Sequence, residues 1–314
     1  MLGPPENKDP GTASFGWVSR IHIGLSGWSY RDWVGRFYPE DLPADRWLPF
    51  VAEHFDTVEV NRSFYSLLDP STYRSWYGGV PDGFVFAIKG SRYITHMKKL
   101  HDVETPMANF FASGVLELGD KLGPMLWQLP GRWRFRAERV RDFISMLPTT
   151  TGEAAGLAAR HDDRVREPAT DSHVDRPLRH VMEVRDPSFF VPELLEILME
   201  RNVAFAISHS SAWPYTEDVI GEIAYLRLHG PAALYSSPYS EADLSRWTRL
   251  VTAWAAGTDS ADGPRISSGA HPREDGRDVF VYFDNDSGAH APPDALRLRQ
   301  LVDDPSAATG GSGE

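Results

Sequence analysis

The sequence predicts an α/β protein in which eight parallel strands close into a (β/α)8, TIM-barrel-like fold. Short β-type runs alternate with longer helical patterns along most of the 314 residues, and there are eight such runs. Barrels of this kind reach about 250 residues as one unit. An open, doubly wound sheet is the alternative, but closure removes the edge strands that an open sheet must protect. We therefore expect a single domain over residues 20–302.

Each expected strand is a run of β-branched, aromatic or other apolar residues between polar or turn-forming positions. In chain order the runs are 21–25, 57–60, 84–88, 125–129, 180–184, 203–208, 223–229 and 279–283. Helical periodicity predicts helices at 47–54, 71–76, 107–122, 137–146, 192–200, 242–255 and 295–301. The sixth connection, 210–221, lacks a clear helical pattern.

Two polar stretches that contain glycine and proline interrupt this alternation, at residues 149–177 and 257–278. Because strand patterns resume after each stretch, we interpret both as surface insertions within one domain. The two ends of the chain, 1–19 and 303–314, have the composition of disordered tails.

Composition excludes several classes of protein. The chain has 32 basic and 44 acidic side chains, a net charge of −12, and no cysteine. Disulfide scaffolds, iron–sulfur clusters and thiolate zinc sites are excluded because each needs the sulfur of cysteine. The negative charge argues against nucleic acid as a partner bound over a broad face, although it does not exclude a small cationic cleft. No apolar run approaches the about 20 residues of a membrane helix, and no secretory leader is evident, so we expect a cytoplasmic protein without a membrane partner.

Charged and polar side chains lie at the carboxyl ends of five expected strands. Side chains alternate between the interior and the helix layer, so residues two apart on a strand share the barrel mouth. Barrel enzymes place their chemistry at this end, and burying several charges there costs several kcal/mol per ion before pairing, which stability alone does not favour. The residues are Glu59, Asn61, Lys89, Gln128, Glu183, Arg185, Tyr225, Arg227 and His229.

Carboxylates among cations at one mouth predict recognition of a small anion, such as a phosphorylated sugar or a nucleotide-like compound. Glu59 and Glu183 are the candidate acid/base catalysts. The aromatic residues Trp28, Tyr30 and Tyr65 lie near the same mouth and would suit a sugar face or a planar base. Purely structural pairing of each glutamate with an arginine stays an open alternative.

Two other functions stay open. A divalent-metal hydrolase or phosphodiesterase could use Glu183, His209 and His229, but no His-Glu-x-x-His motif occurs and the arginines compete for the space of a cation. We therefore predict no cofactor and keep a metal as the minor alternative. A non-catalytic ligand sensor or scaffold is the other possibility, because fold does not determine function. The oligomeric state has no signature in the sequence.

The order of several motifs resembles the DUF72 (YecE-like) family, TIM-barrel-like proteins without an established reaction. The motifs include Gly24-Leu25-Ser26-Gly27-Trp28-Ser29-Tyr30, Glu59-Val60-Asn61-Arg62-Ser63-Phe64-Tyr65, Glu183-Val184-Arg185, Tyr225-Leu226-Arg227-Leu228-His229-Gly230 and Tyr282-Phe283-Asp284-Asn285-Asp286. The resemblance implies one shared cleft for Glu59, Asn61, Tyr65, Lys89, Gln128, Glu183, Arg185, Arg227 and His229. Asn285 of the last motif is a further candidate for ligand binding. This chain departs from the family pattern at His209, Phe189 and Asp284.

Overall fold

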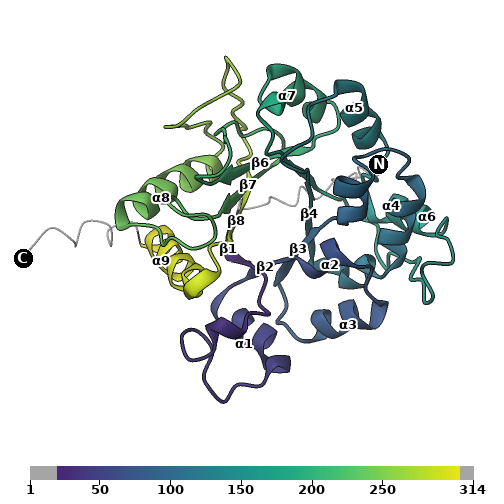
Figure 1. Cartoon of the computed structure of the whole chain (residues 1–314), viewed down its shortest axis with the longest axis horizontal. Coiled ribbons are helices and arrows are strands. Elements are labelled where there is room, and N and C mark those ends of the chain that lie inside the picture. The colour runs from purple at the N-terminus through teal and green to yellow at the C-terminus, as the bar shows by residue number, and fades with distance from the viewer. Residues whose placement is uncertain (1–19, 305–314) are drawn as a thin grey trace, which may run out of the picture.

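Eight parallel strands form a closed barrel in the computed structural model, which describes residues 20–304. The strands follow one another around the barrel in chain order from β1 to β8. The last strand pairs with the first, with Gly24 opposite Tyr282. Helices surround the strands on the outside (Figure 1). The predicted fold class is therefore confirmed.

The strands agree with the predicted runs to within a few residues. Their bounds are β1 (Ile21–Ser26), β2 (Thr57–Val60), β3 (Val85–Lys89), β4 (Leu122–Gln128), β5 (His180–Glu183), β6 (Ala204–His209), β7 (Ile223–Leu228) and β8 (Asp278–Phe283). The helices are α1 (Trp47–His54), α2 (Arg62–Tyr65), α3 (Pro70–Gly78), α4 (Glu104–Ala112), α5 (Ala137–Ser145), α6 (Thr151–Ala158), α7 (Pro192–Met199), α8 (Glu241–Ala255) and α9 (Ala291–Asp303).

One predicted helix is wrong, because the pattern over 107–122 is not a single element. Helix α4 ends at Ala112, and Gly114 adopts φ 109°, a left-handed conformation that favours glycine and breaks the helix. A 3-10 segment, Val115–Lys121, then leads into β4. The short helix α2 was not predicted. The connection between β6 and β7 has no helix, as expected.

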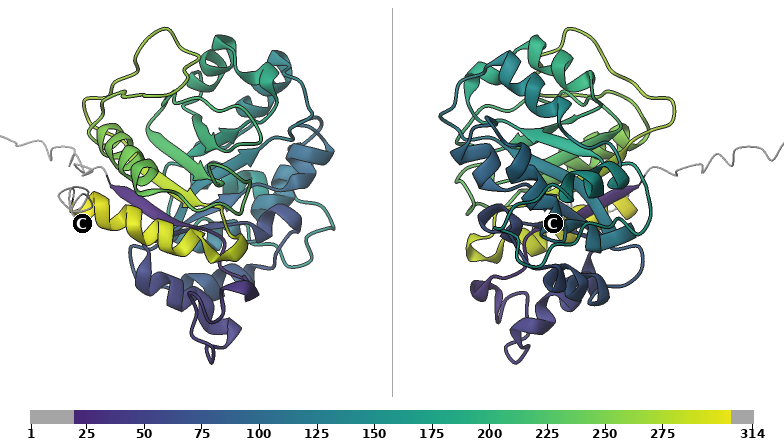
Figure 2. Two further views of the ribbon diagram at one scale, coloured as in Figure 1. Left: turned by 60° about the vertical axis from the view of Figure 1, so that its left-hand side comes forward. Right: turned by 90° about the vertical axis from the view of Figure 1, so that its right-hand side faces the viewer.

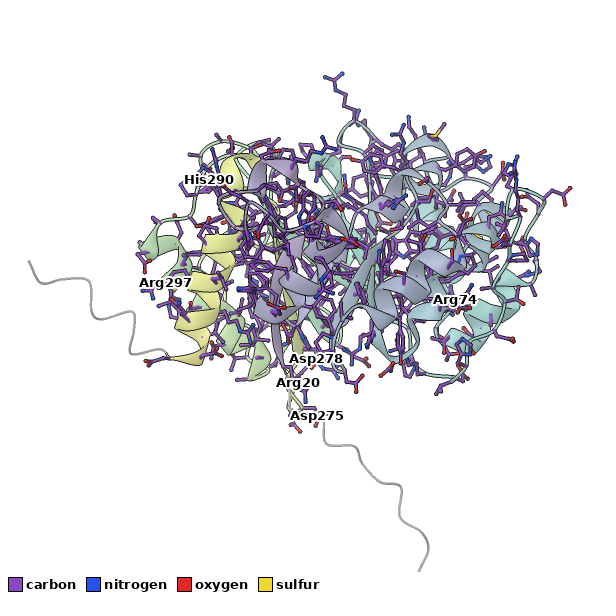
Figure 3. All side chains as sticks on the ribbon, turned by 90° about the horizontal axis from the view of Figure 1, so that it is seen from below. Arg20, Arg74, Asp275, Asp278, His290 and Arg297 are labelled. Atoms are coloured by element: carbon purple, nitrogen blue, oxygen red, sulfur yellow. The ribbon has the colours of Figure 1, made fainter. Side chains whose placement is uncertain are left out.

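The barrel interior is apolar below a charged layer. Its floor mixes small and aromatic side chains, namely Ala87, Leu126, Val181, Ala204, Ala206, Ile223, Tyr225, Phe280 and Tyr282. At the amino-terminal end, the ring of His22 stacks on Phe280 with centroids 4.8 Å apart. Figure 3 shows Arg20 beside Asp278 at the start of β1 and β8, where the Arg20 amide donates to the Asp278 carboxylate at 3.2 Å. The polar mouth lies at the opposite, carboxyl end of the strands, with Glu59, Lys89 and Glu183 at or next to the last residues of β2, β3 and β5.

The first insertion contains a helix that the sequence did not predict. Helix α6 begins after Thr150, whose hydroxyl accepts a hydrogen bond from the Glu153 amide. The insertion is attached to α4, because Asn109 and Asp162 exchange two hydrogen bonds of 2.9 Å. It is therefore an integral part of the helix layer.

The second insertion, 257–278, has no helix or strand before β8 and projects as an extended loop (Figure 2). Two buried carboxylates of the β6–β7 connection hold it. Glu217 accepts from the amides of Asp262 and Gly263 at 2.8 Å each, and Asp218 accepts from the Ile266 amide at 2.6 Å. Helix α9 extends through Asp303, one residue into the predicted tail; residues 1–19 and 305–314 of the two predicted tails lie outside the described residues. Within residues 20–304, no helix has the length and apolarity to cross a membrane.

Candidate functional site

The centre of the mouth is Arg227 of β7, which is completely buried. Its guanidinium donates to Glu59 at 2.7 and 3.0 Å, to Glu183 at 2.9 Å and to Asp284 at 2.7 Å. The three carboxylates come from β2, from β5 and from the end of β8. One cation thus holds three anions, an arrangement that its planar, multiply donating guanidinium suits.

Glu59 is saturated with donors besides Arg227. Its carboxylate accepts from the Ser26 hydroxyl at 2.6 Å and from the Tyr225 hydroxyl at 2.7 Å. Asn61 donates to the Ser26 hydroxyl at 3.0 Å, which ties the amide to the same network. The Asn61 Oδ1 atom is buried without a hydrogen-bond partner among the described residues. Its acceptor capacity is therefore unused among the described residues.

Arg185 is the outermost arginine of the site. Its Nε donates to Glu183 at 2.8 Å, and its guanidinium lies 3.8 Å from the centroid of the Trp213 ring. The terminal nitrogens have only long contacts, 3.4 Å to the Tyr235 hydroxyl and 3.5 Å to His229 Nε2. The side chain keeps 14% of its surface exposed. The guanidinium is thus fixed in plane but keeps donor capacity toward the mouth.

The carboxyl groups of the mouth differ in their protonation. Burial alone would raise the pKa of Glu183, but the charges of Arg185 and Arg227 outweigh it and lower the pKa below its usual range. The pKa of Asp284 is lowered as well, because Arg227 outweighs burial there. Asp286 has the opposite shift, since burial and the neighbouring charge of Asp284 raise its pKa. The site therefore combines ionised carboxylates with one carboxyl group that favours its proton.

Lys89, the last residue of β3, is buried but lacks an anionic partner. It is 8% exposed, and its Nζ lies 4.6 Å from the centroid of the Phe64 ring. Within the described part of the chain, Nζ has no hydrogen bond and no carboxylate within 4.0 Å. Burial, followed by the charge of Arg227, lowers the pKa of Lys89 to about 8. Gln128, 6% exposed, is on the neighbouring strand β4 in register with Glu183.

An aromatic hollow of about 280 Å³ adjoins this cluster. Trp28, Tyr30, Asn61 and Trp76 are among its lining residues, and the two tryptophan rings meet edge to face at 5.2 Å. Tyr65, expected at the same place, is 67% exposed and lines a different hollow with Ser91 and Tyr93. The structure therefore brings Trp28, Tyr30 and Asn61 together and leaves Tyr65 outside this hollow.

Two candidate residues are not brought into the mouth, because they lie at outward positions of the strand alternation. Asn285 is completely buried, and its amide donates to the Ser237 carbonyl at 3.0 Å and to Asp294 at 2.8 Å. The ring of His209 packs against Trp247 with centroids 5.2 Å apart. Neither side chain contributes to the charged layer.

The metal trio proposed from the sequence is therefore incorrect as a set. His209 lies in the helix layer, whereas His229 is inside the mouth with Nε2 3.1 Å from Asp284. Among residues 20–304, no group of three or more metal-ligating side chains converges. Arg227 instead lies between the carboxylates of Glu59 and Glu183.

Sequence reasoning missed several members of the network. Ser26, Ser208 and Asp284 are at inward-facing positions of the two-residue alternation. The pattern that predicted Glu59 in the mouth therefore predicts these three residues as well. Ser208 donates to Glu183 at 3.2 Å. Trp213 and Tyr235 come from the loops after β6 and β7, where no periodic signal exists.

A closed parallel barrel with a buried charged cluster at the carboxyl ends of its strands defines a TIM-barrel-like α/β protein. The family model described as "Protein of unknown function DUF72" matches residues 22–312, and the chain belongs to this family. The resemblance inferred from the motifs is thereby confirmed.

Two curated relatives carry the designation UPF0759. The chain is 28% identical over 185 residues to protein YecE of Escherichia coli K12, covering 53% of this chain and 65% of the relative. It is 26% identical over 125 residues to protein YunF of Bacillus subtilis, covering 38% of this chain and 43% of the relative. The matches thus span less than two thirds of these relatives.

Solved DUF72 family structures share the fold over nearly the whole chain. A protein from Thermotoga maritima superposes with a TM-score of 0.68 at 21% identity, covering 91% of this chain and 100% of that one. One from Enterococcus faecalis has a TM-score of 0.65 at 18% identity, covering 90% and 95%. At such identities the likeness shows the fold alone.

Proposed function

We propose that the mouth binds a small ligand through an anionic group, such as the phosphate of a sugar or nucleotide-like compound, between Lys89 and Arg185. The observation that carries this proposal is Lys89, a buried side chain whose ammonium has no anionic partner among the described residues. Arg227 has three carboxylate partners, whereas Lys89 has none within 4.0 Å among the described residues. A buried charge without a partner is costly, and an anionic ligand would supply that partner.

Arg185 supports the proposal as a second anchor. Stacking on Trp213 holds its guanidinium, and the long contacts of its terminal nitrogens leave donors for a phosphate or carboxylate. Both cations are close enough to His96 to affect its protonation. Burial, followed by the charges of Lys89 and Arg185, lowers the pKa of His96 to about 4. An anion between the two cations would therefore meet a neutral imidazole rather than a further competing charge.

The aromatic hollow would take the uncharged part of the ligand. Asn61 joins the two regions, since it lines the hollow and donates to Ser26 in the charged network. Aromatic faces such as those of Trp28 and Trp76 suit a sugar ring or a planar base. This arrangement favours a ligand with both an anionic group and a ring.

The acid/base roles predicted for Glu59 and Glu183 stay predictions. Both side chains are completely buried, and each is held by Arg227. In this proposal their first task is to orient the arginines, and Asp286 offers the protonated carboxyl group that a general acid needs. The expected cytoplasmic location and the absence of a nucleic-acid partner also stay predictions.

Calorimetric titration with inorganic phosphate, followed by a set of sugar phosphates and nucleotides, tests the proposal. We expect binding by the full-length protein and a loss of at least about tenfold in Lys89→Met and Arg185→Met. Lys98→Met is the matched control, because it makes the same change of charge at a partly exposed lysine nine residues along the chain. Binding that survives Lys89→Met unchanged would refute the site. Turnover of a bound compound that is lost in Glu59→Gln or Glu183→Gln while binding remains would separate an enzyme from a sensor.

A further inference from the structure

We propose that Lys89 forms an imine with the carbonyl carbon of its ligand, which makes that ligand an aldehyde or ketone that also carries a phosphate or carboxylate. The inference rests on the anion-binding function proposed above and adds a covalent bond to it. Its basis is the position and surroundings of the Lys89 amine, which differ from those of a structural lysine in the same chain.

The amine of Lys89 is directed into the mouth but makes no hydrogen bond or ion pair with the described residues there. Lys89 follows Ala87 at the inward parity of β3, and its Nζ lies against the Phe64 ring at 4.6 Å. Lys121 is also buried, at 4% exposure, but its Nζ donates to the carbonyls of Tyr77 and Val80 at 2.8 Å each. The Lys121 ammonium is thus satisfied by the fold, whereas the Lys89 amine is not.

The charged groups around Lys89 come from four sides of the barrel. They are Arg227 on β7, Glu59 on β2, Glu183 on β5 and Asp284 after β8. Burial and the Arg227 cation together outweigh the carboxylates, and the pKa of Lys89 is lowered to about 8. On the order of one Lys89 in ten is then a neutral amine at pH 7, against well below one in a hundred for an ordinary lysine. A desolvated lysine next to another cation is the established way to activate an amine nucleophile.

The step needs no oxidant or reductant. The lone pair of the neutral amine attacks the carbonyl carbon, a C–N bond forms, and the carbonyl oxygen takes one hydrogen from the nitrogen to give a carbinolamine. The carbinolamine hydroxyl then leaves with the second amine hydrogen as water, and the C=N bond is formed. Arg185, whose terminal nitrogens keep free donor capacity, would hold the anionic group while this occurs.

Reductive trapping tests the inference directly. The full-length protein is treated with glyoxylate, an aldehyde that carries a carboxylate, and with cyanoborohydride, which reduces an imine to a stable amine. The chain has five lysines, at positions 8, 89, 98, 99 and 121, so peptide mass spectrometry can assign every adduct. We expect the adduct mainly on Lys89, with a labelling rate that rises around pH 8. Comparable labelling of Lys89, Lys98 and Lys99 would overturn the inference without requiring any variant to fold.

A variant separates this inference from the anion site. Lys89→Arg keeps a cation but removes the imine-forming amine, so we expect retained phosphate binding and no trapped adduct at residue 89. Lys98→Arg is the matched control and should be trapped at Lys89 as the wild type is. If glyoxylate leaves Lys89 unmodified in a protein that still binds phosphate through Lys89, the imine is refuted and the proposed function stands. If phosphate binding is absent as well, both fail.

Discussion

Arg227 and Glu59 form a two-pronged ion pair inside the barrel mouth, with Nε 3.0 Å from one carboxylate oxygen and Nη2 2.7 Å from the other. Neither side chain has any exposed surface. The bidentate pairing fixes the plane of the guanidinium, so its remaining nitrogen hydrogens point to Glu183, Asp284 and the His229 ring. The charged layer therefore behaves as one unit centred on a single cation.

Replacing that cation should damage the whole layer. Arg227→Met leaves Glu59 and Asp284 without their arginine partner and leaves Glu183 with Arg185 alone, and breaking a buried pair from one side costs about 3–5 kcal/mol. We expect a loss of this size in the free energy of unfolding, measured by urea denaturation at pH 7. Arg160→Met is the control, because its pair with Glu104 is exposed on both sides and such surface pairs contribute about 0–1 kcal/mol. Equal losses for the two variants would contradict the central role of Arg227.

Glu183 should contribute to acid sensitivity. Its pKa is lower in the folded chain than the unfolded value of about 4.3, so its stabilisation is present above that pH and is lost as the pH falls toward the folded pKa. Glu183→Gln should be less stable than wild type at pH 7 and should lose stability less steeply between about pH 4 and pH 3. The difference in slope is at most about 1.4 kcal/mol per pH unit. Denaturant unfolding over this range, with the exposed Glu138→Gln as control, measures it; parallel curves would contradict the pairing.

The strand order was predictable from the alternation of strand and helix patterns along the chain, and the mouth was predictable from the period of two within each strand. Inward parity places Glu59, Lys89, Glu183 and Arg227 at one end of a closed barrel, and the structure confirms that placement. The same alternation places His209 on the outward face of β6, so the sequence alone argues against His209 as a metal ligand in the mouth. Loops carry no such period, and for this reason Trp213 under Arg185 could not be found from the sequence.

The pairing scheme was also beyond the sequence. Each glutamate had several possible cationic partners. In the structure Arg227 pairs with Glu59, Glu183 and Asp284, while Lys89 has no anion within 4.0 Å among the described residues. The prediction of one helix over 107–122 is wrong for a local reason, because the left-handed Gly114 interrupts an otherwise apolar helical pattern.

His209 should behave as a packing residue. Its ring lies against Trp247, and its Nδ1 is 3.0 Å from the Tyr239 hydroxyl. His209→Phe keeps a ring and removes one hydrogen bond, so we expect a loss of about 1 kcal/mol in stability with unchanged phosphate binding. His229→Phe, inside the mouth, should weaken phosphate binding. Denaturant unfolding and phosphate titration of both variants measure these effects. Elemental analysis of the same proteins and the wild type tests for a metal, and stoichiometric zinc or manganese that disappears with His209 would restore the metal hypothesis.

Lys89 and Lys121 should respond in opposite directions to the same substitution. The folded pKa of Lys89, about 8, is below the unfolded value of about 10.4, so the charged form is penalised in the fold. That penalty is fully present below pH 8 and disappears as the pH rises toward 10.4, because only the unfolded chain then binds the proton. Lys89→Met should therefore raise the free energy of unfolding at pH 7 by on the order of 2 kcal/mol, with a smaller gain at pH 10.

Lys121→Met provides the contrast, because it leaves the carbonyls of Tyr77 and Val80 without their buried donor. A loss of about 1–3 kcal/mol is expected for that change. Denaturant unfolding of both variants at pH 7 and pH 10 measures the difference. Destabilisation by both substitutions would mean that Lys89 is a structural lysine, since only an ammonium without an internal partner makes the fold more stable when it is removed.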